Sequence, residues 1–131
     1  MPLRSKGKQE MNGKYLLDTN AIIYAIDRKL KLPANRYAIS VVTEMELLSW
    51  PSLALEDEAK LKSVLMKLAV IQLDRSIQET AIRIRRTTAL KLPDSIISAT
   101  AINGGYVLVT DDEKLKSRHV GSAITLNELI S

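Results

Sequence analysis

The chain has 131 residues, 46% hydrophobic and 26% charged, a composition that suits one globular domain with a single core. The absence of cysteine and the single histidine exclude disulfides, thiol nucleophiles and thiolate or multi-histidine zinc sites. A net charge of +4 favours a polyanionic partner but does not prove one. With four Tyr, one Trp and no Phe, base stacking on an aromatic platform is not expected to dominate any nucleic-acid contact.

The predicted elements alternate between strand and helix along the chain. A polar, basic arm is expected over residues 1–13, and one domain over residues 14–131. Short apolar runs predict buried strands at residues 15–18, 37–40, 70–73, 106–109 and 123–126. Periodic or capped segments predict helices at residues 41–48, 56–69, 74–91 and 93–105. This order predicts an α/β three-layer sandwich with a mostly parallel central sheet of about five strands and helices on both faces.

No membrane span or secretory leader is expected, because the apolar runs are too short and the first fourteen residues are polar and basic. A cytoplasmic location is therefore expected.

Acidic residues gather where the predicted sheet would form a site, just beyond the carboxyl ends of its strands. Asp18 ends the first strand, and Asp111 and Asp112 follow the fourth. Asp94 opens the helix that leads into that fourth strand, and Glu44 lies one turn into the helix after the second. Each has a simpler explanation, since Asp commonly caps helices and Glu44 could be a solvated helix residue, with Glu46 equally available.

The acids taken together favour a cation. Several carboxylates at one edge repel one another unless protons or a cation neutralise them. Hard oxygen ligands without Cys or His suit Mg²⁺ or Mn²⁺ rather than zinc. Such ions activate water for attack on a phosphodiester.

Four segments in order resemble the PIN-domain ribonucleases, most closely the VapC-type toxins of type II toxin–antitoxin systems. They are "LLDTNAII", "AISVVTEMELL", "LPDSIISATAINGG" and "YVLVTDD", and the resemblance covers roughly residues 14–131. It implies a metal-dependent endoribonuclease that uses Mg²⁺ or Mn²⁺, pairs with a cognate antitoxin and forms a homodimer. The acidic quartet that it implies is Asp18, Glu44, Asp94 and Asp112. These residues would bind the metal directly or through water.

The resemblance also assigns supporting residues. Thr110 would orient the site, and Asn20 is the polar residue beside the first acid. Asp111 adds a fifth carboxylate, and either it or Asp112 could be the fourth acid. The Thr110-x-Asp112 spacing favours Asp112.

Residues 75–91 carry five basic residues against one acid. They form either a solvated helix face or a phosphate-binding ridge beside the acids. Arg83 and Arg86, which share a helix face, and Lys91 are the candidate RNA-binding residues.

Two other classes compete with the nuclease hypothesis. The first is a PIN-like scaffold that binds RNA or protein without cleaving. The second is a phosphotransfer domain of the haloacid-dehalogenase or receiver type. The dehalogenase pattern requires an Asp where Asn20 stands, and a receiver requires its acidic pair near the first strand. Both departures disfavour the phosphotransfer class.

Overall fold

The computed structural model describes residues 13–131, so residues 1–12 of the predicted basic arm lie outside the described part. Its centre is a five-stranded sheet in the order β3-β2-β1-β4-β5. The strands are β1 (Lys14–Leu17), β2 (Arg36–Ser40), β3 (Ala69–Ile71), β4 (Val107–Val109) and β5 (Ala123–Ile124). Every pairing is parallel, so the predicted α/β sandwich is confirmed and its sheet is wholly parallel.

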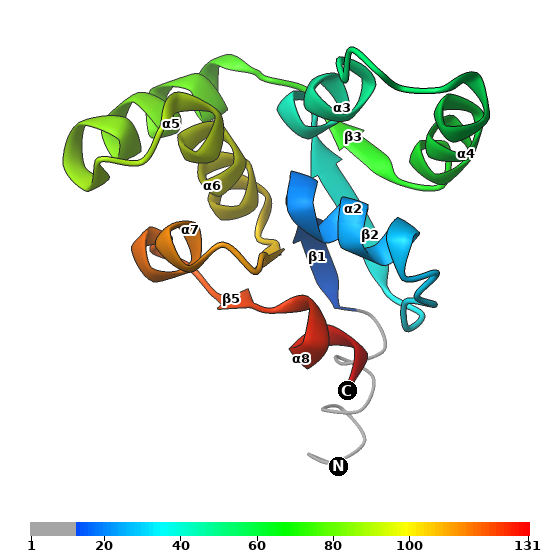
Figure 1. Cartoon of the computed structure of the whole chain (residues 1–131). Helices are drawn as coiled ribbons and strands as arrows, with labels where there is room; N and C mark the ends of the chain where they lie inside the picture. Colours follow the sequence, from blue (N-terminus) through cyan, green and yellow to red (C-terminus); the bar gives the residue numbers. More distant parts are fainter. Residues whose placement is uncertain (1–12) are drawn as a thin grey trace.

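Seven helices in residues 13–131 flank the sheet: α2 (Thr19–Asp27), α3 (Val41–Leu48), α4 (Leu55–Leu65), α5 (Arg75–Thr88), α6 (Leu92–Gly104), α7 (Glu113–Arg118) and α8 (Leu126–Ile130). Figure 1 shows α5, α6 and α7 on one side of the sheet and α2 and α4 on the other. No helix among residues 13–131 is long and apolar enough to cross a membrane.

The two faces follow from alternation along the strands. Leu16 joins the core cluster that includes residues of α5, α6 and α7, whereas its neighbour Leu17 joins the cluster built with α2, α3, α4 and α8. Both leucines are almost fully buried. A strand buried on both faces therefore appears in the sequence as a continuous apolar run.

Several predicted boundaries differ from the structure. The helix predicted over residues 56–69 ends at Leu65, because turn hydrogen bonds at Lys67 and Leu68 release the chain into β3. The helix predicted over residues 74–91 ends at Thr88, where Ala89 adopts a left-handed conformation with φ 60°. The last predicted strand ends at Ile124, since Thr125 forms a capping box with Glu128 and starts α8.

The strand order fixes where a site forms. β1 lies between β2 and β4. The chain adds β2 and β3 on one side of β1 and then crosses over to add β4 and β5 on the other side. The carboxyl ends of β1 and β4 therefore border the crevice in which open α/β sheets usually bind ligands. Asp18 follows β1 directly, and Thr110, Asp111 and Asp112 follow β4.

Candidate active site

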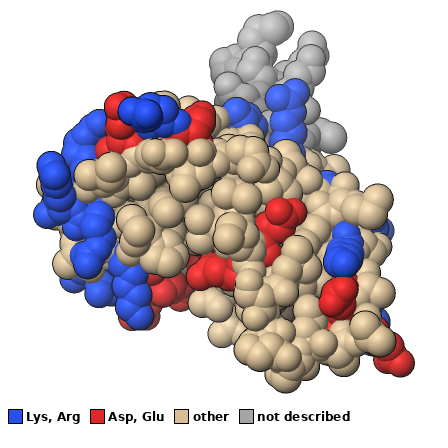
Figure 2. Space-filling view, turned by 90° about the horizontal axis from the view of Figure 1, so that it is seen from above, with Lys and Arg blue, Asp and Glu red and all other residues tan. Residues whose placement is uncertain are grey.

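A pocket of about 260 Å³ opens at this crevice, and we call it the acidic pocket. Four carboxylate residues from four different segments line it: Asp18, Glu46, Asp94 and Asp112. Its other lining residues are Thr19, Asn20, Ile23, Leu47, Trp50 and Ile97. Seen from above, the molecule shows acidic side chains near the middle of the surface, and Lys and Arg side chains gather on the side where α5 and α7 lie (Figure 2).

Asp18 is both a helix cap and a wall of the pocket. It is only 4% exposed, and its Oδ1 accepts a hydrogen bond from the Ala21 N–H at 2.7 Å. Its Oδ2 accepts from the Thr110 hydroxyl. Burial raises the pKa of Asp18 to about 6, with smaller contributions from the charges of Asp111 and Asp112, although both hydrogen bonds oppose the rise. Each oxygen keeps a free lone pair, so capping does not prevent Asp18 from binding a cation.

Thr110 connects the first acid to the fourth. Besides donating to Asp18, its Oγ1 accepts the Asp112 N–H at 3.0 Å. Thr110 is fully buried, so its side chain is held in place by these contacts and by packing. The predicted orienting residue therefore contacts both aspartates.

The two aspartates of "TDD" face different neighbours. Asp112 caps α7 through the Leu115 N–H at 3.0 Å and also lines the acidic pocket. Asp111 accepts the Leu126 N–H at 3.1 Å, at the start of α8, and is not among the pocket's lining residues. The geometry therefore favours Asp112 as the pocket acid.

Asp94 reaches the pocket from the first turn of α6, as its position after β3 and α5 predicts. It is half-buried, and burial is the largest cause of its raised pKa. The charges of Asp112 and Glu46 raise that pKa further, whereas Lys91 and Lys114 lower it. Asp94 therefore interacts electrostatically with Asp112 and Glu46 across the pocket.

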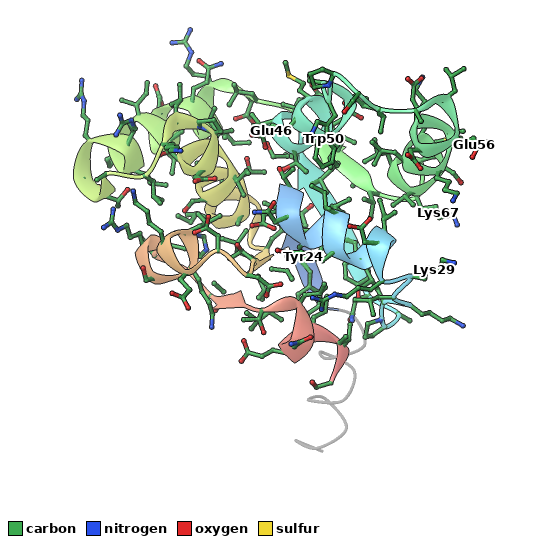
Figure 3. The ribbon with its side chains drawn as sticks, in the orientation of Figure 1. Tyr24, Lys29, Glu46, Trp50, Glu56 and Lys67 are labelled. Carbon is green, nitrogen blue, oxygen red and sulfur yellow. The ribbon has the colours of Figure 1, made fainter. Side chains whose placement is uncertain are left out.

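The structure places Glu46, not Glu44, in the acidic pocket. Residues two apart on an α-helix point about 200° apart, so only one of the two can face the crevice. Figure 3 shows Glu46 on the side of α3 that faces α6. The Thr19 hydroxyl donates to Glu46 Oε1 at 2.6 Å, and the buried Thr43 hydroxyl lies 3.3 Å from that of Thr19.

The sequence pattern does not distinguish the two glutamates. Thr43 and Leu47 are buried one turn apart, Glu46 lies three residues after Thr43, and Glu44 lies three residues before Leu47. Thr19 and Thr43 were not singled out from the sequence either. Together they fix one oxygen of Glu46 at the pocket wall.

The predicted basic residues do not all lie beside the acids. Lys91 is close enough to lower the pKa of Asp94, and so is Lys114, which was not predicted from the sequence. Arg83 lines a different groove with residues such as Tyr106 and His119. Arg86 is exposed on α5 and does not line the acidic pocket.

The donor set fits a hard divalent cation, because every ionisable group lining the acidic pocket is a carboxylate. Within residues 13–131, however, no three His, Cys, Asp or Glu side chains are already close enough together to hold one ion. Mg²⁺ usually keeps several waters and binds directly to only one or two carboxylates. The arrangement is therefore compatible with ligation partly through water.

A family model for the PIN domain matches residues 15–120, so the chain belongs to the PIN domain family. The fold agrees with solved structures of VapBC-type complexes, which confirms the resemblance drawn from the sequence. A toxin–antitoxin complex from Klebsiella pneumoniae is 26% identical, with a TM-score of 0.71, covering 86% of this chain and 97% of that one. DNA-bound VapBC from Salmonella typhimurium is 25% identical, with a TM-score of 0.74, covering 87% and 98%.

VapBC2 from Rickettsia felis, bound to a promoter DNA fragment, is 23% identical with a TM-score of 0.73, covering 86% of this chain and 98% of that one. At that identity the likeness concerns the fold alone. No curated sequence matches the chain significantly.

Proposed function

We propose that this chain is a Mg²⁺- or Mn²⁺-dependent endoribonuclease that acts as the toxin of a toxin–antitoxin pair. The observation that carries the proposal is the gathering of four carboxylates from separate segments around one pocket at the switch point of the sheet. The family supports a nuclease, and the VapBC neighbours support the toxin role.

Asp18, Asp94 and Asp112 are the proposed metal-holding residues. We assign the fourth position to Glu46 in place of Glu44, because Glu46 lines the pocket and is held by Thr19. The bound ion would supply an activated water for in-line attack on phosphorus, leaving 5′-phosphate and 3′-hydroxyl ends.

The residues of the chain perform the remaining tasks. Thr110 holds Asp18 and Asp112 in register through its single hydroxyl. Glu46 either completes the ligand set through water or accepts a proton from the attacking water. Lys91 and Lys114, near Asp94, offset the repulsion between the acidic pocket and a phosphate backbone.

We also propose an antitoxin partner, a homodimer and a cytoplasmic location, as the resemblance to VapC-type toxins implies. The neighbours from Klebsiella pneumoniae and Salmonella typhimurium support the antitoxin in particular, since both are structures of toxin–antitoxin complexes. Lys91 stays a proposed RNA contact. Arg83 and Arg86 stay proposals with weaker support, because neither lines the acidic pocket.

The alternative is a PIN-like scaffold that binds RNA or protein without cleaving. It is favoured by one observation, that no three carboxylates among residues 13–131 are preassembled around a single point. A metal-binding measurement separates the two, because a scaffold needs no divalent ion.

The direct test incubates the purified full chain with structured and single-stranded RNA in Mg²⁺, in Mn²⁺ and in EDTA. We expect internal cleavage with either ion, none in EDTA, and products with 5′-phosphate ends. Cleavage that persists in EDTA, or no cleavage with either ion, would contradict the proposal. Growth arrest on expression, relieved by a co-expressed antitoxin, would test the toxin role separately.

A further inference from the structure

Trp50 is an exposed aromatic residue beside the acidic pocket. It is the chain's one tryptophan, and 53% of its surface is accessible. It lies just beyond the C-terminus of α3, close to Glu46 (Figure 3). An exposed indole at the rim of a pocket is a candidate contact for a flat ring, because Trp stacks well on aromatic systems.

Trp50 belongs to two hollows at once. Besides the acidic pocket, it lines a neighbouring groove of about 310 Å³ between α2, α3 and α4, which we call the apolar groove. Ile23 and Leu47 are also shared, so the two hollows are adjacent. An RNA strand with a phosphate at the acids would therefore have the apolar groove beside it.

The lining of the apolar groove suits a nucleobase. Ile26, Leu53 and Leu61 supply an apolar surface for a flat ring. Asp27, Asp57, Lys60 and Ser52 supply polar groups around it. Carboxylates accept hydrogen bonds from exocyclic amino groups, and a lysine donates to base carbonyls and ring nitrogens.

We propose that the apolar groove binds one unpaired base of a single-stranded RNA, stacked on Trp50, next to the phosphate held at the acidic pocket. Adenine, guanine and cytosine should bind better than uracil, because only they carry an amino group for Asp27 or Asp57. The inference deepens the proposed function by naming a base-binding site for the RNA substrate, and it rests on that function for the position of the phosphate.

One stacked base does not require an aromatic platform. The scarcity of aromatic residues argues against a row of stacked bases, and it leaves room for a single base site. The acidic rim at Asp27 and Asp57 disfavours a phosphate inside the apolar groove itself, which leaves the base as the part of the nucleotide that fits.

Tyr24 offers a matched control. It is an exposed aromatic residue on α2, 40% accessible, and it lines neither the acidic pocket nor the apolar groove. Its ring lies under Arg28, 5.2 Å from the guanidinium carbon. Replacing it removes exposed aromatic surface without changing a residue that lines the proposed base site.

The test uses the full chain with Asp94→Asn, in which the proposed cleavage is slow, and Mg²⁺. Because Trp50 is the sole tryptophan, its fluorescence reports directly on stacking. We expect a short single-stranded RNA to quench the emission saturably, and one abasic position next to the cleaved phosphate to abolish the quenching. In anisotropy measurements with labelled RNA, Trp50→Leu should weaken binding about five- to a hundredfold, and Tyr24→Leu should leave it unchanged.

Equal RNA affinity of the Trp50→Leu variant, or quenching that an abasic strand reproduces at every position, would overturn the inference. Quenching by an antitoxin peptide but not by RNA would also overturn it and would assign the apolar groove to a protein partner. If the wild type cleaves RNA and Trp50→Leu does so with the same KM and base preference, the base site fails while the nuclease stands. If RNA quenches Trp50 in a base-dependent way but is never cleaved, the base site stands and the nuclease fails.

Discussion

Two aspartates in this molecule begin helices with nearly the same geometry. Asp18 accepts the Ala21 N–H at 2.7 Å at the start of α2, and Asp74 accepts the Ile77 N–H at 2.8 Å at the start of α5. Asp18 is 4% exposed and lies against Thr110 near Asp111 and Asp112, whereas Asp74 is exposed to solvent. The cap alone therefore does not distinguish a structural aspartate from a candidate catalytic one.

The two aspartates differ in the residues that surround their carboxylates. An exposed cap such as Asp74 contributes about 1 kcal/mol to stability through one hydrogen bond. Asp18 makes the same bond and is also forced close to other carboxylates at the sheet edge, which favours a proton or a cation. Capping and cation binding are compatible, because a carboxylate has more lone pairs than one cap requires.

The largest expected effect is a difference in RNA cleavage between the Asp18→Asn and Asp74→Asn variants. Asp18→Asn keeps a capping oxygen but removes the charge, so we expect cleavage to fall about a hundredfold or more. Asp74→Asn keeps its cap equally well and should cleave RNA at the wild-type rate. Rates with Mg²⁺ under single-turnover conditions check this, and equal losses in both variants would show that Asp18 acts only as a cap.

The second contrast lies within α3. Glu46→Gln removes a charge from the acidic pocket, and we expect a loss of about tenfold to a hundredfold in cleavage and weaker Mn²⁺ binding. Glu44→Gln, on the other side of the helix, should change neither property appreciably. A strong effect of Glu44→Gln with a silent Glu46→Gln would restore the assignment made from the sequence.

A smaller, mixed effect is expected at the "TDD" pair. Asp112→Asn should impair cleavage, because Asp112 lines the acidic pocket. Asp111→Ala should leave the cleavage rate nearly intact and cost about 1 kcal/mol of unfolding free energy, since it removes the acceptor for the Leu126 N–H. Thermal unfolding in parallel with kinetics separates these outcomes, and a reversed pattern would assign the fourth position to Asp111.

The pH dependence of stability gives a further test without RNA. In EDTA, the raised pKa of Asp18, about 6 against an ordinary 3.8, means that the folded chain holds this proton more tightly than the unfolded chain. The resulting stability is fully present below pH 4 and is lost as pH rises through about 6, by about 3 kcal/mol. Asp94, whose pKa is also raised, adds a change of the same sign.

Asp18→Asn cannot ionise, so denaturant unfolding of this variant should show a clearly smaller loss of stability between pH 4 and pH 7. At neutral pH without metal, the variant should be more stable than the wild type. A variant with an unchanged pH profile would contradict the account of a buried, repelled carboxylate.

Much of the fold follows from the sequence because periodicity and burial are locally encoded. The five apolar runs became the five parallel strands, and the positions of Asp18, Asp94 and Asp112 follow from the strand ends and the helix start that they adjoin. The ends of α4 and α5 were missed because turn hydrogen bonds and the left-handed Ala89 ended these helices where the residue pattern continued.

The fourth acid was harder to predict. Glu44 and Glu46 have the same chemistry and lie on the same short helix, so the choice depends on how that helix is rotated against α6. The rotation is set by the burial of Thr43 and Leu47, which is a tertiary property. The position of Arg83 also depends on tertiary packing, since the packing of α5 on α6 determines which residues of α5 line the groove that contains Arg83.

The central claim is that Asp18, Glu46, Asp94 and Asp112 share a divalent cation. A crystal structure of the full chain grown with Mn²⁺ tests it directly through anomalous scattering from the metal. The account predicts a peak inside the acidic pocket, within direct or water-mediated reach of these four carboxylates. A peak bound by Glu44 or Asp111 instead, or an acidic pocket without manganese at millimolar Mn²⁺, would contradict it.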